Sequence, residues 1–141
     1  FTPDPQAEAV AQLWARYRIS AGAADAYARD GFVAIVQDVI LGDVLASYLD
    51  LIETRPLYLI VLAPRADIIA LREAARDKQG YDAWTIDDLD RALRDDTPRL
   101  GLWLDSSEQT PAQTVDEVLA RLPEALIADH EDRTLRGAHM H

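Results

Sequence analysis

Three segments of the chain consist almost entirely of apolar residues. They read FVAIV at 32–36, LYLIVL at 57–62 and LGLWLD at 100–105. Their apolar residues follow one another without alternating with polar ones, which is typical of strands buried on both faces of a parallel sheet. The pattern therefore predicts three parallel strands at these positions.

Helical patterns precede, separate and follow the predicted strands. The first has apolar residues at three- and four-residue spacing, namely Val10, Leu13, Trp14, Tyr17 and Ala21. Further helices are expected at 43–53, at 67–76, from 84 onward, after Thr110 and, as a short final helix, over 123–130. Thr110 is the expected N-cap of its helix, with Gln113 completing a capping box. The alternation of strands and helices predicts an α/β fold, a three-layer parallel sheet with helices on both faces.

Composition limits the classes of function. The 141 residues carry a formal net charge of −11 and include no cysteine, which excludes disulfides and thiolate metal sites. Because binding to polyanions draws on clustered Lys and Arg, we expect neither nucleic acid nor an anionic membrane as a partner. No apolar run approaches the roughly 20 residues that span a bilayer, and no signal peptide opens the chain, so a cytoplasmic protein is expected. We expect one domain over residues 1–136 and a tail at 137–141 that resembles a cloning remnant.

The ends of the predicted strands are the first candidate site, because ligands of open parallel sheets bind beyond the carboxyl ends of the strands. Two of these ends deliver a carboxylate, at Asp38 and at Asp105, and Asp105 is followed by Ser106 and Ser107. Such a carboxylate can hold Mg²⁺ through water or accept a proton from a hydroxyl. The alternative interpretation is that each aspartate caps the loop or helix that follows it.

A cationic cluster in REAARDKQGYDAW is the second candidate site. Arg72, Arg76 and Lys78 lie within seven residues, and Lys78 is the only lysine in the protein. Arg72 and Arg76 share a helix face, and guanidinium groups are well shaped to clamp phosphoryl oxygens. The alternative is that the two arginines serve the C-terminal end of a helix, with neighbouring acids as partners.

The residues after this cluster suggest a lid. Gly80 would let the segment close over a ligand, and Tyr81 and Trp84 could then cover the ligand and exclude water. The alternative for the two aromatic residues is packing of the lid helix against the core.

Together, the QDVI strand end, the R-E-A-A-R…G-Y…W stretch and TPRLGLWLDSSEQTPAQTVDEVL resemble the small P-loop kinases related to chloramphenicol phosphotransferase. These belong to the nucleoside-monophosphate and shikimate kinase superfamily, and the resemblance covers roughly residues 3–127. It implies an ATP-dependent phosphotransferase that uses Mg²⁺ and moves the γ-phosphoryl group of ATP to a hydroxyl of a small molecule.

The resemblance also implies roles for individual residues. Asp38 would lie close to the metal and phosphates, although Gln37 stands where a second acid is expected. Arg72 and Arg76 match lid arginines that stabilise the transferring group. The remaining implied contacts are cofactor binding by Asp105, Ser106, Ser107 and Lys78, and substrate binding by Tyr81 and Trp84.

The chain departs from the family in one large respect. The phosphate-binding loop G-x-x-x-x-G-K-[ST] is absent, since none of the six glycines precedes a lysine. The predicted domain is therefore incomplete at its N-terminus, and we expect these residues alone to bind ATP weakly or not at all. The missing part could belong to a longer form or to a separate chain. The third interpretation is a non-catalytic binding or interaction module on a degenerate kinase scaffold. Losing the central strand would also expose sheet edges at 32–36 or 100–105 to pairing with another chain.

Overall fold

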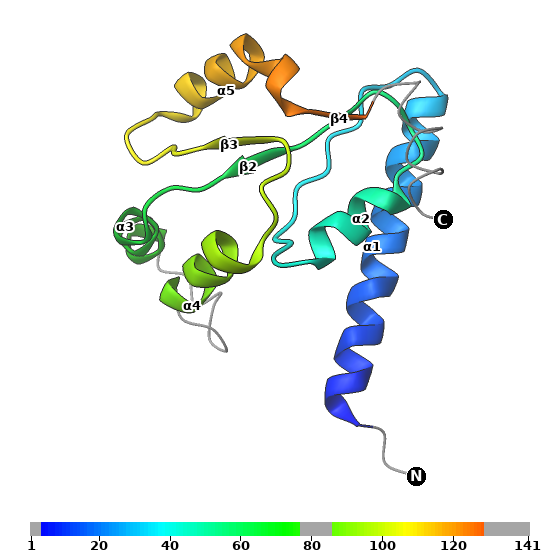
Figure 1. The fold of residues 1–141 in the computed structure, drawn as a ribbon, viewed down its shortest axis with the longest axis horizontal. Helices are drawn as coiled ribbons and strands as arrows, with labels where there is room; N and C mark the ends of the chain where they lie inside the picture. Colours follow the sequence, from blue (N-terminus) through cyan, green and yellow to red (C-terminus); the bar gives the residue numbers. More distant parts are fainter. Residues whose placement is uncertain (1–3, 77–85, 129–141) are drawn as a thin grey trace. The chain divides into compact units, whose positions relative to one another are not determined.

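The computed structural model describes residues 4–76 and 86–128, apart from the side chains of 73–76 and 128. Contacts within the chain divide it into two compact units, Phe1–Thr54 and Arg55–His141. Figure 1 shows the helices and strands of each unit. The single domain over 1–136 stays a prediction, and the tail at 137–141 lies outside the described residues.

Residues 4–54 of the first unit form two helices, α1 (Pro5–Arg29) and α2 (Val44–Leu51). Asp4 caps α1 by accepting a hydrogen bond from the backbone N–H of Gln6 at 3.0 Å, and Pro5 occupies the first turn, where its missing N–H costs nothing. The helix ends before Gly31, which has a φ of +92° that favours glycine. The first predicted helix, which carries the apolar residues from Val10 to Ala21, is confirmed.

The core of this unit lies between α1 and α2. Its buried apolar residues are Tyr17, Ala21, Leu45, Tyr48, Leu49 and Ile52. The rings of Tyr17 and Tyr48 meet edge to face with their centroids 5.2 Å apart, an arrangement that aromatic pairs prefer. The Tyr48 hydroxyl lies 2.9 Å from the Ser20 hydroxyl, so the polar end of this buried ring has a hydrogen-bond partner.

The strand predicted at 32–36 is not formed. Residues 32–41 belong to neither a helix nor a strand, and the side chains of Val33 and Ile35 are 90% and 89% exposed. A strand needs the backbone of a neighbouring strand, and the described part of the first unit contains only helices. The segment instead lines an open hollow of about 510 Å³ together with residues of α1.

The described part of the second unit contains four short strands in two sheets. They are β1 (Leu57–Tyr58), β2 (Ile60–Leu62), β3 (Leu102–Leu104) and β4 (Leu126–Ala128). β2 and β3 pair in parallel, with Ile60 opposite Leu102 and Leu62 opposite Leu104. β1 pairs antiparallel with β4, which lies within the range where a final helix was predicted. The apolar runs at 57–62 and 100–105 thus supply a parallel pair, while the three-layer α/β sheet stays a prediction.

Gly101 allows the two sheets to meet. It has a φ of +74°, and a Cβ added there would clash with the backbone oxygen of Leu59 and lie 2.8 Å from the Leu59 Cβ. The same Leu59 oxygen accepts a hydrogen bond from the N–H of Leu102 at 3.0 Å. Only glycine permits this close approach at the start of β3.

Helices cover the parallel pair. In Figure 1, α5 (Pro111–Ala120) lies on one side of β2 and β3, and α3 (Ala66–Arg76) and α4 (Ile86–Arg91) lie on the other. A π-helical turn, η1 (Ala92–Asp96), extends α4, and a 3₁₀ turn, η2 (Leu122–Ala125), follows α5. The apolar core here consists of Leu102, Leu104 and Ala125, with Ile60, Val118 and Leu122 packed against them. Across both described ranges, no helix is long and apolar enough to cross a bilayer.

The capping box predicted for α5 is confirmed. The Thr110 hydroxyl accepts a hydrogen bond from the Gln113 N–H at 3.2 Å, and the Gln113 side chain accepts one from the Thr110 N–H at 2.9 Å. Two backbone donors that the helix leaves unpaired are thereby satisfied. This cap sets where the chain turns from the end of β3 into α5.

Candidate functional site

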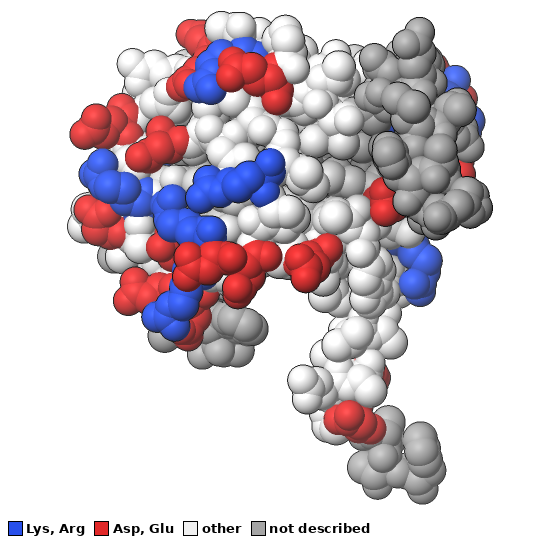
Figure 2. Space-filling view, viewed as in Figure 1, with Lys and Arg blue, Asp and Glu red and all other residues white. Residues whose placement is uncertain are grey.

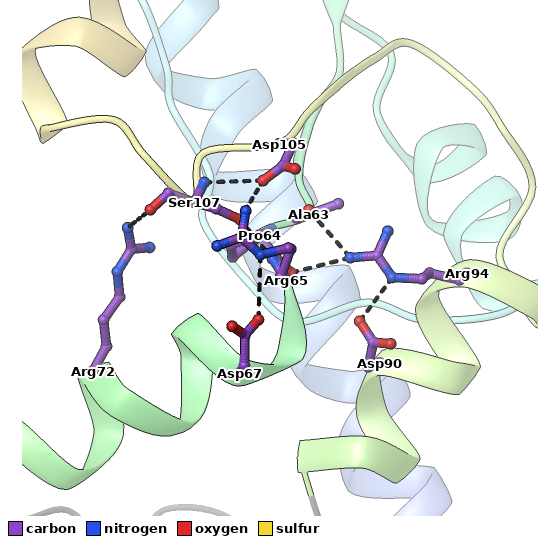
Figure 3. Close-up of polar contacts among 9 residues, drawn as sticks. All are labelled: Ala63, Pro64, Arg65, Asp67, Arg72, Asp90, Arg94, Asp105 and Ser107. Carbon is purple, nitrogen blue, oxygen red and sulfur yellow. Dashed lines mark hydrogen bonds and ion pairs between the residues drawn. The ribbon is translucent and has the colours of Figure 1, made fainter.

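The carboxyl ends of β2 and β3 lie at the same edge because the two strands run parallel. The chain leaves β2 through Ala63-Pro64-Arg65 and leaves β3 through Asp105-Ser106-Ser107. The Ala63 N–H donates to the Leu104 oxygen at 2.7 Å, and the Arg65 N–H donates to the Ser107 hydroxyl at 2.8 Å. These two exits, with the arginines and aspartates that contact them, form what we term the strand-exit cluster (Figure 3).

Asp105 orders the exit from β3. Its Oδ1 accepts hydrogen bonds from both the hydroxyl and the backbone N–H of Ser107, the latter at 2.9 Å. These two bonds hold the pKa of Asp105 below its usual range, and the charges of Arg65 and Arg94 act in the same direction. The carboxylate is therefore ionised at neutral pH. These contacts fit the alternative in which Asp105 caps the loop that follows it. The second carboxylate oxygen, Oδ2, accepts no hydrogen bond from any residue that the structure describes.

Arg72 connects α3 to the exit from β3. Its Nη2 donates to the Ser106 oxygen at 3.1 Å and approaches the Ser107 oxygen at 3.5 Å. The side chain is exposed, and its Nε and Nη1 have no partner among the described residues. The structure therefore brings the predicted catalytic Arg72 into contact with the predicted nucleotide-binding loop 105–107.

Two further arginines of the cluster were not singled out by the sequence. Arg94 donates from Nη2 to the oxygens of Ala63 and Pro64 at 3.3 and 3.1 Å, and from Nε to Asp90 at 2.8 Å. Arg65 pairs through Nε with Asp67 at 3.3 Å. The four-residue spacing of Asp90 and Arg94 is a sequence signal for their ion pair. Nothing in the sequence indicates that Arg94 contacts the backbone oxygens of Ala63 and Pro64, which follow β2.

The cluster carries equal numbers of formal charges of each sign. Arg65, Arg72 and Arg94 lie with Asp67, Asp90 and Asp105, three cations with three carboxylates (Figure 3). The face of the molecule in Figure 2 likewise shows basic and acidic side chains intermixed. An anion that binds at the cluster must therefore compete with carboxylates for the guanidinium groups.

Asp38 lies in the first unit and is described apart from the cluster. Its Oδ1 accepts from the Val39 N–H at 2.7 Å and pairs with Arg16 of α1 at 3.2 Å. Among the residues with described side chains, no group of three or more His, Cys, Asp or Glu could hold a metal ion. The catalytic and metal-binding roles of Asp38 stay predictions.

The side chains of the remaining predicted site residues lie outside the described part of the chain. Arg76 ends α3, but its side chain lies outside the described residues. Lys78, Gly80, Tyr81 and Trp84 also lie outside them. Of the residues predicted to form or flank the lid, Arg72 is the one whose side chain the structure describes.

Comparisons of the chain with models of protein families, with curated proteins and with solved structures found no match. The resemblance to small P-loop kinases thus rests on its sequence motifs. The geometry of the strand-exit cluster is an observation independent of that resemblance.

Proposed function

We propose that this chain forms part of an ATP-dependent small-molecule phosphotransferase and that the strand-exit cluster contacts the phosphates of the nucleotide. One observation carries the proposal. The guanidinium group of Arg72 reaches the Ser106–Ser107 loop at the shared carboxyl edge of two parallel strands. This edge is where ligands of parallel sheets bind, and guanidinium groups donate paired hydrogen bonds to phosphate oxygens.

The proposed roles follow from the groups that remain available. Arg72 keeps two donor nitrogens for a transferring phosphoryl group, whose charge it would stabilise in the transition state. The loop at 105–107 offers one carboxylate oxygen of Asp105 to a donor group of the nucleotide, because Ser106 is buried and the Ser107 hydroxyl already donates to Asp105 and accepts from the Arg65 N–H. In the reaction, the bond between the γ-phosphorus and its bridging oxygen breaks and ADP leaves, while the substrate hydroxyl oxygen bonds to the phosphorus and its proton passes to solvent. Mg²⁺ would neutralise phosphate charge, but the described side chains form no group of His, Cys, Asp or Glu that could hold the ion.

Weak nucleotide binding is part of the proposal. In P-loop kinases the phosphate-binding loop cradles the phosphates with backbone N–H groups and a lysine, and these 141 residues lack that loop. The equal numbers of arginines and aspartates in the cluster reduce its attraction for an anion further. We therefore expect a millimolar or weaker Kd for ATP.

A titration with ATP tests the binding step. Amide resonances of the ¹⁵N-labelled chain should shift at residues 63, 65, 72 and 105–107, and arginine Nε resonances should shift at Arg65 and Arg72. Arg72→Ala should raise the Kd about tenfold, because one charge-assisted hydrogen bond contributes about 1.5–3 kcal/mol. Arg91→Ala is the matched control. Arg91 is exposed on α4, and its ion pair with Asp88 is long, with 3.9 Å between the two groups. Shifts that avoid the cluster, or an Arg72→Ala variant with unchanged affinity, would contradict the proposal.

Phosphoryl transfer is tested on the natural protein. Intact mass and N-terminal sequencing establish whether a G-x-x-x-x-G-K-[ST] segment precedes these residues. In a form that carries the segment and is active, Arg72→Ala should lower kcat at least about tenfold, with a smaller change in KM. Unchanged kcat would remove Arg72 from the reaction.

The second candidate function is a non-catalytic interaction module. The exposed apolar side chains of Val33 and Ile35 favour it, because contiguous exposed apolar residues mark interaction surfaces. A natural protein of 15.7 kDa, the mass of these 141 residues, would favour this module over the kinase.

A further inference from the structure

We infer that Arg65 is a second anion-contacting residue of the strand-exit cluster and that Asp67 is its internal counter-ion, displaced when the anion binds. The inference rests on the proposed function, because it concerns the same site. It adds a residue that the sequence motifs do not single out and a carboxylate that sets the affinity.

The main chain of Arg65 is held firmly in place. Its N–H donates to the Ser107 hydroxyl at 2.8 Å, and its oxygen accepts from the N–H groups of Ile68 and Ile69 at 3.0 and 3.1 Å. These contacts fix Arg65 at the point where β2 ends and α3 begins. Only the side chain is left to move, from a base that already adjoins the loop at 105–107.

The guanidinium group of Arg65 is held loosely. Its Nε lies 3.3 Å from the Asp67 carboxylate, and the two side chains are 49% and 68% exposed. Exposed ion pairs of this kind contribute little to stability because water and salt screen them. Neither Nη nitrogen of Arg65 has a partner in the part of the chain that the structure describes. An anion can therefore take the guanidinium from Asp67 at little cost.

Arg94 differs from Arg65 in each of these respects. Its Nε–Asp90 contact is shorter, at 2.8 Å, and the side chains are only 36% and 22% exposed. The same guanidinium also donates to the oxygens of Ala63 and Pro64. Moving Arg94 toward an anion would leave those carbonyls and Asp90 without a donor, which is costly for partly buried groups. Arg94 thus stabilises the exit from β2. Arg65 is the arginine whose guanidinium group can leave its carboxylate partner and bind an anion.

The counter-ion arrangement makes two substitutions change affinity in opposite directions. Arg65→Ala removes a donor to the anion, and Asp67→Asn removes the competing carboxylate while keeping the size of the side chain. A merely structural role for the Arg65–Asp67 pair predicts the same direction for both, because either change would loosen the start of α3.

The experiment measures the Kd of inorganic pyrophosphate for the 141-residue chain, without divalent metal, at pH 7 and low ionic strength. Arg65→Ala should raise the Kd about tenfold. Asp67→Asn should lower it about two- to fivefold. The matched controls are Arg91→Ala on α4 and Asp116→Asn on α5, which make the same charge changes at exposed positions that are not members of the cluster. Each control should change the Kd less than twofold, or about 0.4 kcal/mol.

Several outcomes would overturn the inference. If Arg72→Ala weakens pyrophosphate binding but Arg65→Ala does not, Arg65 is not a ligand, and the proposed function survives. If Asp116→Asn tightens binding as much as Asp67→Asn, only net charge matters and the counter-ion role fails. If pyrophosphate does not bind, or neither arginine variant weakens it, both proposals fail. Arg65→Lys keeps the charge but lacks the fork, so its Kd should fall between those of wild type and Arg65→Ala if the fold is intact.

Discussion

Replacing Asp25 with alanine should destabilise the first unit by about 2–4 kcal/mol. Asp25 lies on α1 and is only 5% exposed. Its carboxylate accepts from the N–H groups of Glu53 and Thr54, at 3.1 and 3.0 Å, and from the Thr54 hydroxyl at 2.5 Å. It thereby binds the chain just after α2 to the C-terminal part of α1.

The magnitude follows from the donors that lose their acceptor. A hydrogen bond to a charged group contributes about 1.5–3 kcal/mol, and three donors converge on Asp25. Their effects do not add in full, because Glu53 is exposed and Thr54 half-buried, so water can reach part of the vacated site. Asp25→Asn should cost less, about 1–2 kcal/mol, because the amide keeps one acceptor oxygen.

The difference in the stability of the first unit between wild type and Asp25→Asn should depend on pH. Burial raises the pKa of Asp25, but the bonds from Thr54 and Glu53 outweigh burial and hold the pKa below its ordinary value. The ionised carboxylate therefore stabilises the fold fully above the unfolded pKa of about 3.9. That contribution is lost as the pH falls through the folded pKa. The gap between the two proteins should be constant from about pH 7 to pH 5 and shrink below about pH 4.

Native-state hydrogen exchange of the amides in α2 measures the free energy of opening for this unit specifically. Asp43→Ala is the control, because Asp43 is exposed and its side chain makes no capping hydrogen bond to α2. The reasoning would be refuted if the free energy of opening of Asp25→Ala lay within about 0.5 kcal/mol of that of the Asp43→Ala control. A gap between wild type and Asp25→Asn that is the same at pH 3 and pH 7 would also refute it.

Two further predictions concern the backbone. Gly101→Ala should lower the free energy of unfolding by more than about 2 kcal/mol, because the added Cβ meets Leu59 and the φ is positive. Gly22→Ala, in an open position on α1, should instead raise it by about 0.5–1 kcal/mol, and equal effects in urea denaturation would contradict this contrast. Thr110→Ala should cost about 1 kcal/mol by removing the capping box with Gln113. Unchanged exchange of the first-turn amides of α5 would count against that role.

Signals that lie within a few residues of one another were read correctly from the sequence. Thr110 caps α5, and Gln113 completes its capping box. Each of these contacts joins residues close in the chain, so neighbouring side chains decide it whatever the rest of the molecule does.

The strand-exit cluster was predicted in part. Parallel strands bring their carboxyl ends together, and the exits from β2 and β3 meet for that reason. The contacts of Arg94 with Ala63 and Pro64 could not be predicted, because they join residues about 30 positions apart through backbone oxygens. Every residue has such an oxygen, so the partner of a distant arginine leaves no mark in the sequence.

Residues 32–36 separate what the sequence determined from what only the tertiary structure decided. The sequence determined that the segment is apolar and β-branched, with the composition of a buried strand. Tertiary structure decided that it remains exposed and unpaired, while the short runs at β1 and β4 pair with each other. A helix satisfies its hydrogen bonds within its own segment, whereas a strand satisfies them only with another strand. The amino-acid composition of a segment gives its preference for extended structure. Whether a strand forms depends on the presence of a neighbouring strand in three dimensions.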